Sequence, residues 1–328
     1  MPVYNAAEHL RAAIESILGQ TYNDFEFVIV NDGSTDFSRE TILSFSDPRI
    51  RLIDNPKNKG LIASLNIGLD QCRGEYIIRM DADDISFPER LEKQVGFMDA
   101  HPEVGLMGSW FENFGEGLPT SVVKYDLTDT EIRLRHLYQT HISHPTAVIR
   151  TSVVKKNNLH FDPKFPHGED YEFWVRMSFF CKLANYPDCL LKKRDHIDNI
   201  SNKYSADQRN SCNKVKQEQF RQLGVELTAE DIDLYTRFAD PEWHFTHEET
   251  DRLEDLLTRI SVANEKSAFV PVDAYRKYLA EKWFHLCYQN KHIVNEGWKR
   301  FIRASFSKGH NPGLSGKLKF RLRTSLKR

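Results

Sequence analysis

The chain has 328 residues, 40% of them hydrophobic, and a formal net charge of −2. A chain of this length and composition can bury a large core, and it predicts about two domains. Its near-neutral charge excludes a general attraction to nucleic acid, and no apolar run approaches the ~20 residues that a membrane span needs. The N-terminus has no signal-peptide pattern, and the five cysteines include no Cys-x-x-Cys pair. We therefore expect a cytoplasmic protein with free thiols.

Helical and strand patterns alternate four times in the first 110 residues. Leu10, Ile14 and Leu18 repeat at helical spacing behind Asn5 and Glu8, which form a capping-box-like start. Short apolar runs predict strands at residues 25–30, 50–53 and 76–80, and helices are predicted after residues 36, 60 and 88. This alternation predicts an α/β fold with a Rossmann-like, mostly parallel sheet and flanking helices. In such sheets ligands bind beyond the carboxyl ends of the strands.

The strand that should precede the first helix is almost absent. Only Pro2, Val3 and Tyr4 remain of it. Losing a central strand leaves backbone groups of its neighbours unpaired, at a cost on the order of the net stability of a domain. We therefore expect a truncated first strand: either the natural start lies upstream of Met1, or the chain has a reduced form of the domain.

The pattern becomes mixed after these repeats and then wholly helical. Strands are predicted at residues 104–110, 121–125, 146–150 and 183–191. A helix is predicted over 169–180, with Trp174 and Met177 facing inward. Further on, Thr246 and Glu249 are placed to cap a helix, and aromatic-rich residues 274–288 predict another. We interpret residues 205–328 as an all-helical extension.

Three acidic residues, Asp81, Asp83 and Asp84, directly follow the strand predicted at 76–80. Acids also favour the N-terminus of a helix, and one of these residues could cap the helix predicted near Pro88. That role accounts for one or two acids, but not for three placed directly after an apolar strand. A divalent cation neutralises such a cluster and keeps positions open for phosphate oxygens. The cluster therefore predicts a metal–diphosphate site.

Acidic residues at two other places in the chain are candidates for chemistry. Asp32 lies in turn sequence after the strand at 25–30, where it either shapes the turn or accepts hydrogen bonds from a nucleobase or ribose. Glu169 and Asp170 follow Gly168 at a predicted helix start. They either favour the helix dipole or form a partly desolvated pair with a raised pKa, which suits a general base.

The C-terminal tail, residues 308–328, contains seven basic residues and no acidic ones. Leucines recur every four residues from Leu314 to Leu326. As a helix this segment is basic and amphipathic, which suits peripheral attachment to the inner face of an anionic membrane. A solvated tail is the alternative.

Several motifs together resemble family 2 glycosyltransferases, which are inverting enzymes of the GT-A fold that use nucleotide-activated sugars. The resemblance covers about residues 2–201. The matching segments are Pro2-Val3-Tyr4-Asn5, Asn31-Asp32-Gly33-Ser34-Thr35-Asp36, Asn58-Lys59-Gly60, the Asp-x-Asp motif Asp81-Ala82-Asp83-Asp84, Gly168-Glu169-Asp170, and His196 with Ser201.

The resemblance implies a role for each matching residue. The donor would be bound by Pro2, Tyr4, Asp32, Asn58, Asp81 and Ala82. A Mn²⁺ or Mg²⁺ ion would be held by Asp83 and Asp81, with a weaker contribution from His196. Asp170 would be the general base, with Glu169 beside it. Residues 1–204 would form the GT-A domain, with a nucleotide-sugar half at about 1–110 and an acceptor half at about 111–204.

The implied reaction moves a sugar from a nucleoside diphosphate, with a UDP-sugar as the favoured donor, to a hydroxyl of a glycan or lipid-linked acceptor. Surface polysaccharide or lipopolysaccharide synthesis is the expected setting. Two alternatives remain open. One is a catalytically impaired nucleotide-sugar-binding or scaffold protein. The other is a nucleotidyltransferase, which would need a basic, Gly-rich loop that is absent between Tyr4 and Leu10.

Overall fold

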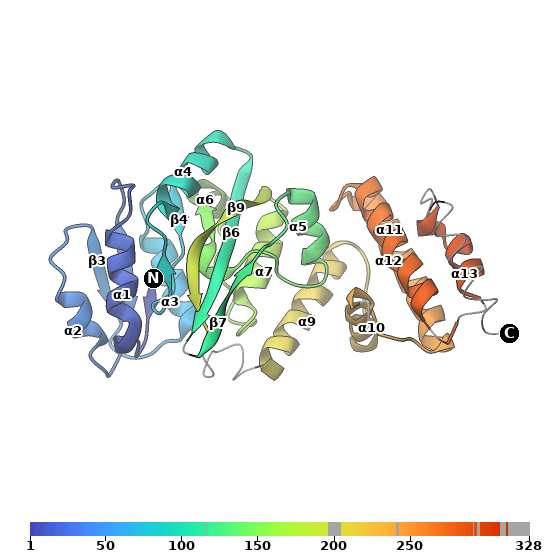
Figure 1. Cartoon of the computed structure of the whole chain (residues 1–328), viewed down its shortest axis with the longest axis horizontal. Coiled ribbons are helices and arrows are strands. Elements are labelled where there is room, and N and C mark those ends of the chain that lie inside the picture. The colour runs from blue at the N-terminus through green and yellow to red at the C-terminus, as the bar shows by residue number, and fades with distance from the viewer. Residues whose placement is uncertain are drawn as a thin grey trace. The chain divides into compact units, whose positions relative to one another are not determined.

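The computed structural model describes residues 1–115, 117–195, 205–240, 243–290, 292–293, 296–308 and 313. The chain forms two compact units, Met1–Val215 and Lys216–Arg328. The first contains the strands, and the described part of the second contains helices (Figure 1). The sequence predicts a domain boundary between residues 204 and 205, where a helix begins. The two units divide after Val215, inside that helix.

A short parallel sheet begins the first unit. Its strands, in spatial order, are β1 (Pro2–Val3), β2 (Phe27–Asn31) and β3 (Ile50–Asp54). The helices that follow them are α1 (Ala7–Leu18), α2 (Ser38–Leu43) and α3 (Leu61–Gln71). β1 has only two residues, as the sequence predicts, and it pairs with the carboxyl end of β2. Every residue of β2 is buried, which explains its continuous apolar sequence.

The second sheet is mixed. Its strands are β4 (Tyr76–Ile78), β5 (Ile85–Ser86), β6 (Val104–Gly115), β7 (Leu118–Val123), β8 (Val148–Arg150) and β9 (Lys182–Arg194). Their order is β4-β8-β6-β9-β5, with β7 paired to β6. β6 runs parallel to β9 and antiparallel to β7 and β8. The α/β class is confirmed, while these antiparallel pairings were not anticipated from the sequence.

The remaining helical elements of this unit position the candidate site. They are α4 (Arg90–Ala100), α5 (Asp129–His136), the 3₁₀ turn η1 (His144–Thr146), α6 (Thr151–Asn157) and α7 (Glu169–Ser178). Trp174 and Met177 of α7 are fully buried, as predicted, and pack in a cluster with Phe161 and Leu106. Full burial of each such side chain contributes roughly 1.5–3 kcal/mol. These two residues therefore anchor α7, including its first turn, in the core.

The start of α1 differs from the prediction. The capping box expected from Asn5 and Glu8 does not form. Instead, the Asp36 carboxylate accepts a hydrogen bond from the Ala7 amide at 3.0 Å, and Ser38 Oγ accepts one from the preceding amide at 2.9 Å. The expectation was wrong because the free amides of a helix start can be capped by side chains from elsewhere in the chain.

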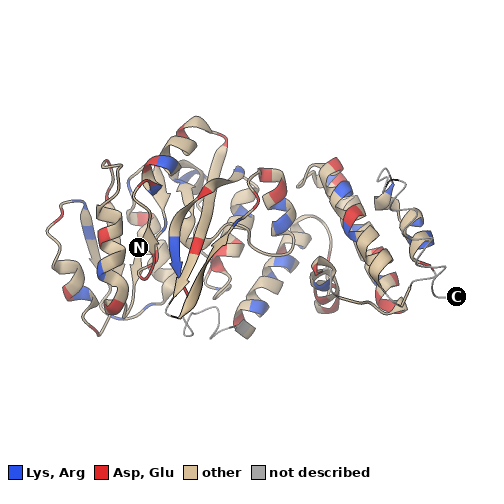
Figure 2. Cartoon of the chain, viewed as in Figure 1, with Lys and Arg blue, Asp and Glu red and all other residues tan. Residues whose placement is uncertain are grey.

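The described part of the second unit is helical, as expected. Its elements are α9 (Ser205–Gln222), which begins in the first unit, α10 (Ala229–Ala239), α11 (His247–Ser267), α12 (Val272–Gln289), α13 (Gly297–Arg303) and the 3₁₀ turn η2 (Ser305–Ser307). Acidic and basic residues are interspersed along α11 and α12 (Figure 2). Within the described ranges, no helix combines the length and apolarity needed to cross a bilayer. Apart from Lys308 and Gly313, the predicted amphipathic tail 308–328 lies outside the described residues.

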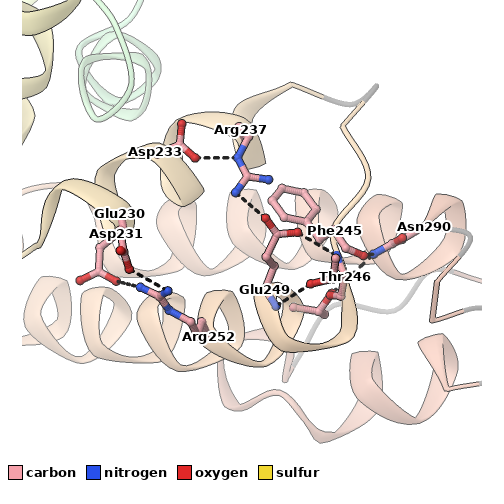
Figure 3. A network of polar contacts seen from close by, with 10 residues as sticks. Glu230, Asp231, Asp233, Arg237, Phe245, Thr246, Glu249, Arg252 and Asn290 are labelled. Carbon is pink, nitrogen blue, oxygen red and sulfur yellow. Dashed lines mark hydrogen bonds and ion pairs between the residues drawn. The ribbon is translucent and has the colours of Figure 1, made fainter.

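A polar network joins α10 to α11 (Figure 3). Thr246 and Glu249 form the predicted capping box at the start of α11. Arg237 donates to Asp233 and to Glu249, at 2.8 Å in both cases, and its guanidinium lies 5.1 Å from the centre of the Phe245 ring. Because Glu249 serves both the cap and the ion pair, the end of α10 is fixed to the start of α11.

Candidate active site

The predicted acidic cluster forms a compact group after β4. Asp81, Asp83 and Asp84 each offer a carboxylate oxygen, and these oxygens lie within 4.8 Å of one another. Asp84 is 1% exposed. Its Oδ1 accepts a hydrogen bond from the Arg194 amide at 2.8 Å, and its Oδ2 has no hydrogen-bond partner among the described residues. Burial, followed by the charges of Asp81 and Asp83, raises the pKa of Asp84 well above its usual value.

This donor set fits a divalent cation. A buried carboxylate oxygen without a partner is costly, and hard oxygen ligands suit Mg²⁺ or Mn²⁺. The sequence assigned the metal to Asp83 and Asp81, and the geometry adds Asp84. The third expected contributor, His196, lies outside the described residues.

Two arginines that were not predicted as site residues border this cluster. Arg79, 9% exposed, forms an ion pair with Asp81. Arg90 is fully buried at the start of α4, and its Nη2 donates to the carbonyls of Arg79 and Pro145, at 2.7 Å in both cases. Burial lowers the pKa of Arg90 to about 9, so it remains protonated at neutral pH. Arg90 therefore fixes the backbone just before the acids. The sequence signal that could have identified both residues is the presence of an arginine on each side of the acidic cluster.

The other predicted acidic pair lies at the start of α7. Burial, followed by the charge of Asp170, raises the pKa of Glu169 to about 7. Burial also raises the pKa of Asp170, whose Oδ1 accepts a hydrogen bond from the Tyr171 amide at 2.7 Å. The charges of Arg79 and Asp81 also act on Glu169. The fold therefore brings the two acidic groups, far apart in sequence, into one electrostatic environment. A carboxylate whose pKa lies near the working pH suits general-base chemistry.

The pKa of Glu169 predicts how stability depends on pH. Its value in the folded chain, about 7, lies above the ordinary 4.5, so the folded state binds the proton more tightly than the unfolded state. Stability therefore falls as pH rises from 4.5 to 7, and above that the carboxylate destabilises the fold by up to about 3 kcal/mol. We expect Glu169→Gln to be more stable than the wild type at pH 8 and nearly equal at pH 5 in urea unfolding with EDTA. A stability difference of the same size at both pH values would contradict this account.

Asp32 is 3% exposed and is surrounded by donors. Its Oδ1 accepts from Asn55 Nδ2 at 2.8 Å and from the Lys59 amide at 2.9 Å. Its Oδ2 accepts from the Gly60 amide at 2.8 Å. The carboxylate thus holds the loop between β3 and α3 closed at its base. This is a different loop from the turn after the strand at 25–30 that the sequence suggested for Asp32, and contact with a nucleotide stays a prediction.

The variant Asp32→Asn shows whether Asp32 stabilises the loop before α3 or only contacts a bound nucleobase. The side-chain amide nitrogen introduced by this change would face backbone N–H groups that now donate to a carboxylate, so a hydrogen bond is lost inside a buried site. We expect the free energy of unfolding without nucleotide to fall by about 1–3 kcal/mol in urea titrations. Asp24→Asn, at an exposed loop position, is the matched control. Unchanged stability of Asp32→Asn would leave contact with a bound base as its role.

The other donor-binding candidates lie near the same edge of the first sheet. Val3 is opposite Asn31, and Asn31 is opposite Asp54, so the carboxyl ends of the three parallel strands meet there. Tyr4 and Asn58 follow two of these ends and are exposed. The remaining candidates are Pro2, which is in β1, and Ala82, which packs against the hydrophobic cluster beside β2. Their contact with a donor stays a prediction.

Known proteins resemble this chain in sequence and in fold. The model for glycosyl transferase family 2 matches residues 1–157. An uncharacterized glycosyltransferase of Haemophilus influenzae is 32% identical over 315 residues, which cover 92% of this chain and 94% of that protein. The amylovoran biosynthesis glycosyltransferase AmsE of Erwinia amylovora is 34% identical over 200 residues, which cover 59% of this chain and 73% of AmsE. The crystal structure of S. aureus TarS 1-349 in complex with UDP-GlcNAc has a similar fold, with a TM-score of 0.59 and 17% identity, covering 98% of this chain and 90% of that one.

Proposed function

Because the chain belongs to glycosyltransferase family 2, we propose that it is a metal-dependent, inverting enzyme. It moves a sugar from a nucleoside diphosphate to a hydroxyl of a glycan or lipid-linked acceptor. One observation carries the proposal: Asp81, Asp83 and Asp84 offer carboxylate oxygens within 4.8 Å of one another, a donor set for the metal that would stabilise the leaving group. The charge of Asp81 also contributes to the raised pKa of Glu169, which supports placing the Glu169–Asp170 pair, as the group that removes the proton, in the same site. Family membership favours sugar transfer over the nucleotidyltransferase alternative.

The donor and the biological setting are proposed from the relatives. TarS was solved in complex with UDP-GlcNAc, which supports a UDP-sugar as donor. AmsE is named for amylovoran biosynthesis, which supports surface polysaccharide synthesis as the setting.

The site residues divide the reaction between them. Asp81, Asp83 and Asp84 would hold Mg²⁺ or Mn²⁺, which when bound supplies positive charge that stabilises the departing nucleoside diphosphate. Asp170, as carboxylate, accepts the proton of the acceptor hydroxyl. The hydroxyl oxygen bonds to the anomeric carbon on the face opposite the diphosphate, the carbon–diphosphate bond breaks, and the configuration inverts. Burial and the charge of Asp170 raise the pKa of Glu169, while Arg79 holds Asp81 by its ion pair.

A screen of nucleotide sugars tests the proposed function. We expect the purified chain to hydrolyse at least one of them, to lose this activity in EDTA, and to regain it with Mn²⁺ or Mg²⁺. Calorimetry with UDP and Mn²⁺ provides the second measurement. If the chain neither hydrolyses a nucleotide sugar nor binds a nucleotide, the result would indicate the catalytically impaired scaffold instead.

A further inference from the structure

Aromatic side chains gather where α12 packs against α13 in the second unit. Phe301 of α13 is 3% exposed, and the centre of its ring lies 5.3 Å from that of Phe284 and 5.8 Å from that of Trp298. Tyr288, one turn after Phe284 on α12, stacks with it at 6.5 Å. Phe284, Tyr288 and Trp298 are each only partly buried. Three aromatic rings therefore lie around the buried Phe301 and still reach solvent.

One side of α13 is apolar where a surface helix is usually polar. Ile302 is 57% exposed, and Trp298 precedes it by one turn, so the two side chains lie on the same side of the helix. An isolated exposed apolar residue is ordinary, but Ile302 continues a cluster of partly exposed rings. We call Phe284, Tyr288, Trp298 and Ile302 the aromatic patch.

Basic residues border the aromatic patch, and Figure 2 shows them along α13. Lys299 and Arg303 are exposed and lie one turn apart, each next to a patch residue in the sequence. Lys308 is also exposed, and it begins the C-terminal tail, which has seven basic residues and no acidic ones. The chain therefore leaves the neighbourhood of the patch with a strong excess of positive charge.

The acidic residues beside α13 are paired with its own arginines. Asp251 and Glu296 pair with Arg300 at 2.5 Å and 3.3 Å. Glu254 pairs with Arg300 at 3.6 Å and with Arg303 at 3.2 Å. These acids are balanced locally, so they leave the positive charge from residue 308 onward uncompensated.

We propose that the aromatic patch docks onto the headgroup region of an anionic lipid bilayer, with the C-terminal tail as the adjoining electrostatic anchor. Trp and Tyr rings have a polar edge, which suits the boundary between headgroups and acyl chains, and a basic segment is attracted to anionic headgroups. A specific protein interface needs ~20–30 residues a side, far more than the four of the patch. The attachment expected from the tail alone thus gains a folded surface.

Binding of the full chain to lipid vesicles tests this assignment. We expect the wild type to bind vesicles of equal parts phosphatidylcholine and phosphatidylglycerol at least about tenfold more tightly than vesicles of phosphatidylcholine alone, and to bind more weakly as NaCl is raised. Ile302→Glu removes an apolar contact and adds a charge that anionic lipid repels, so it should lower the affinity by about tenfold or more. Ile302→Ser, which only removes the apolar contact, should have an intermediate effect.

Leu43→Glu is the matched control, because it makes a similar change on α2 at a position that is 55% exposed. It should bind vesicles like the wild type, and thermal unfolding followed by circular dichroism should show all variants folded. Wild-type binding by Ile302→Glu would overturn docking by the patch and leave the tail as the attachment.

Two further results would also overturn the proposal. One is a wild type that binds no vesicles or does not prefer the anionic ones. The other is a wild type that is dimeric by light scattering while Ile302→Glu is monomeric, because a second copy of the chain would then cover the patch. Vesicle binding needs neither donor nor sugar transfer, so its failure and the failure of the proposed function are separate results.

Discussion

Asp83→Asn is expected to lower sugar transfer by roughly 10³-fold, because removing one carboxylate weakens the hold on a cation that contributes several kcal/mol to leaving-group stabilisation. The three carboxylate oxygens within 4.8 Å, and an Asp84 Oδ2 that has no hydrogen-bond partner among the described residues, support a cation at this cluster. The UDP affinity measured with Mn²⁺ should fall toward the value measured in EDTA. Steady-state transfer rates and calorimetry with and without Mn²⁺ provide the two measurements.

Asp24→Asn is the matched control, since it makes the same change at an exposed loop position. It should keep both the transfer rate and the metal dependence of UDP binding. Full activity of Asp83→Asn, or UDP binding by the wild type that does not respond to EDTA, would remove the metal from the proposed mechanism.

Asp170→Asn should lower the rate of transfer by roughly 10²–10⁴-fold, the usual contribution of a general base. Its effect should differ from that of Asp83→Asn, because the UDP affinity with Mn²⁺ should remain close to that of the wild type. A similar loss of UDP affinity in both variants would mean that Asp170 supports the donor site and is not the base.

The pH profile of the wild type gives an independent measurement of the same pair. Burial raises the pKa values of both carboxyls, that of Glu169 to about 7. A protonated carboxyl cannot take the proton from the acceptor hydroxyl. We therefore expect kcat to be low at acidic pH and to increase as pH rises through about 7. Because the two groups interact, the inflection belongs to the pair and not to one residue. A flat profile between pH 5 and pH 8 would be inconsistent with a base in this environment.

Local signals in the sequence were sufficient for the acids themselves. A few neighbouring residues are enough to recognise the three aspartates after an apolar strand and the acidic pair after Gly168. The capping box at Thr246 is equally local. The same approach failed at α1, where Asp36 and Ser38 provide the caps. It also overlooked Arg79 and Arg90, because an arginine in an amphipathic segment looks exposed until its neighbours are known.

The sequence by itself determined which residues carry charge at strand and helix ends, since periodicity and capping depend on neighbouring residues. Only the tertiary structure decided that the charge of Asp81 acts on Glu169, that Asp32 holds the loop before α3, and that α3 and the residues before α7 enclose a pocket. These features depend on hydrogen bonds and burial between segments that are distant in the chain, such as Asn66 with Phe161. No local pattern encodes such pairs, because they form only when the whole domain closes around its core.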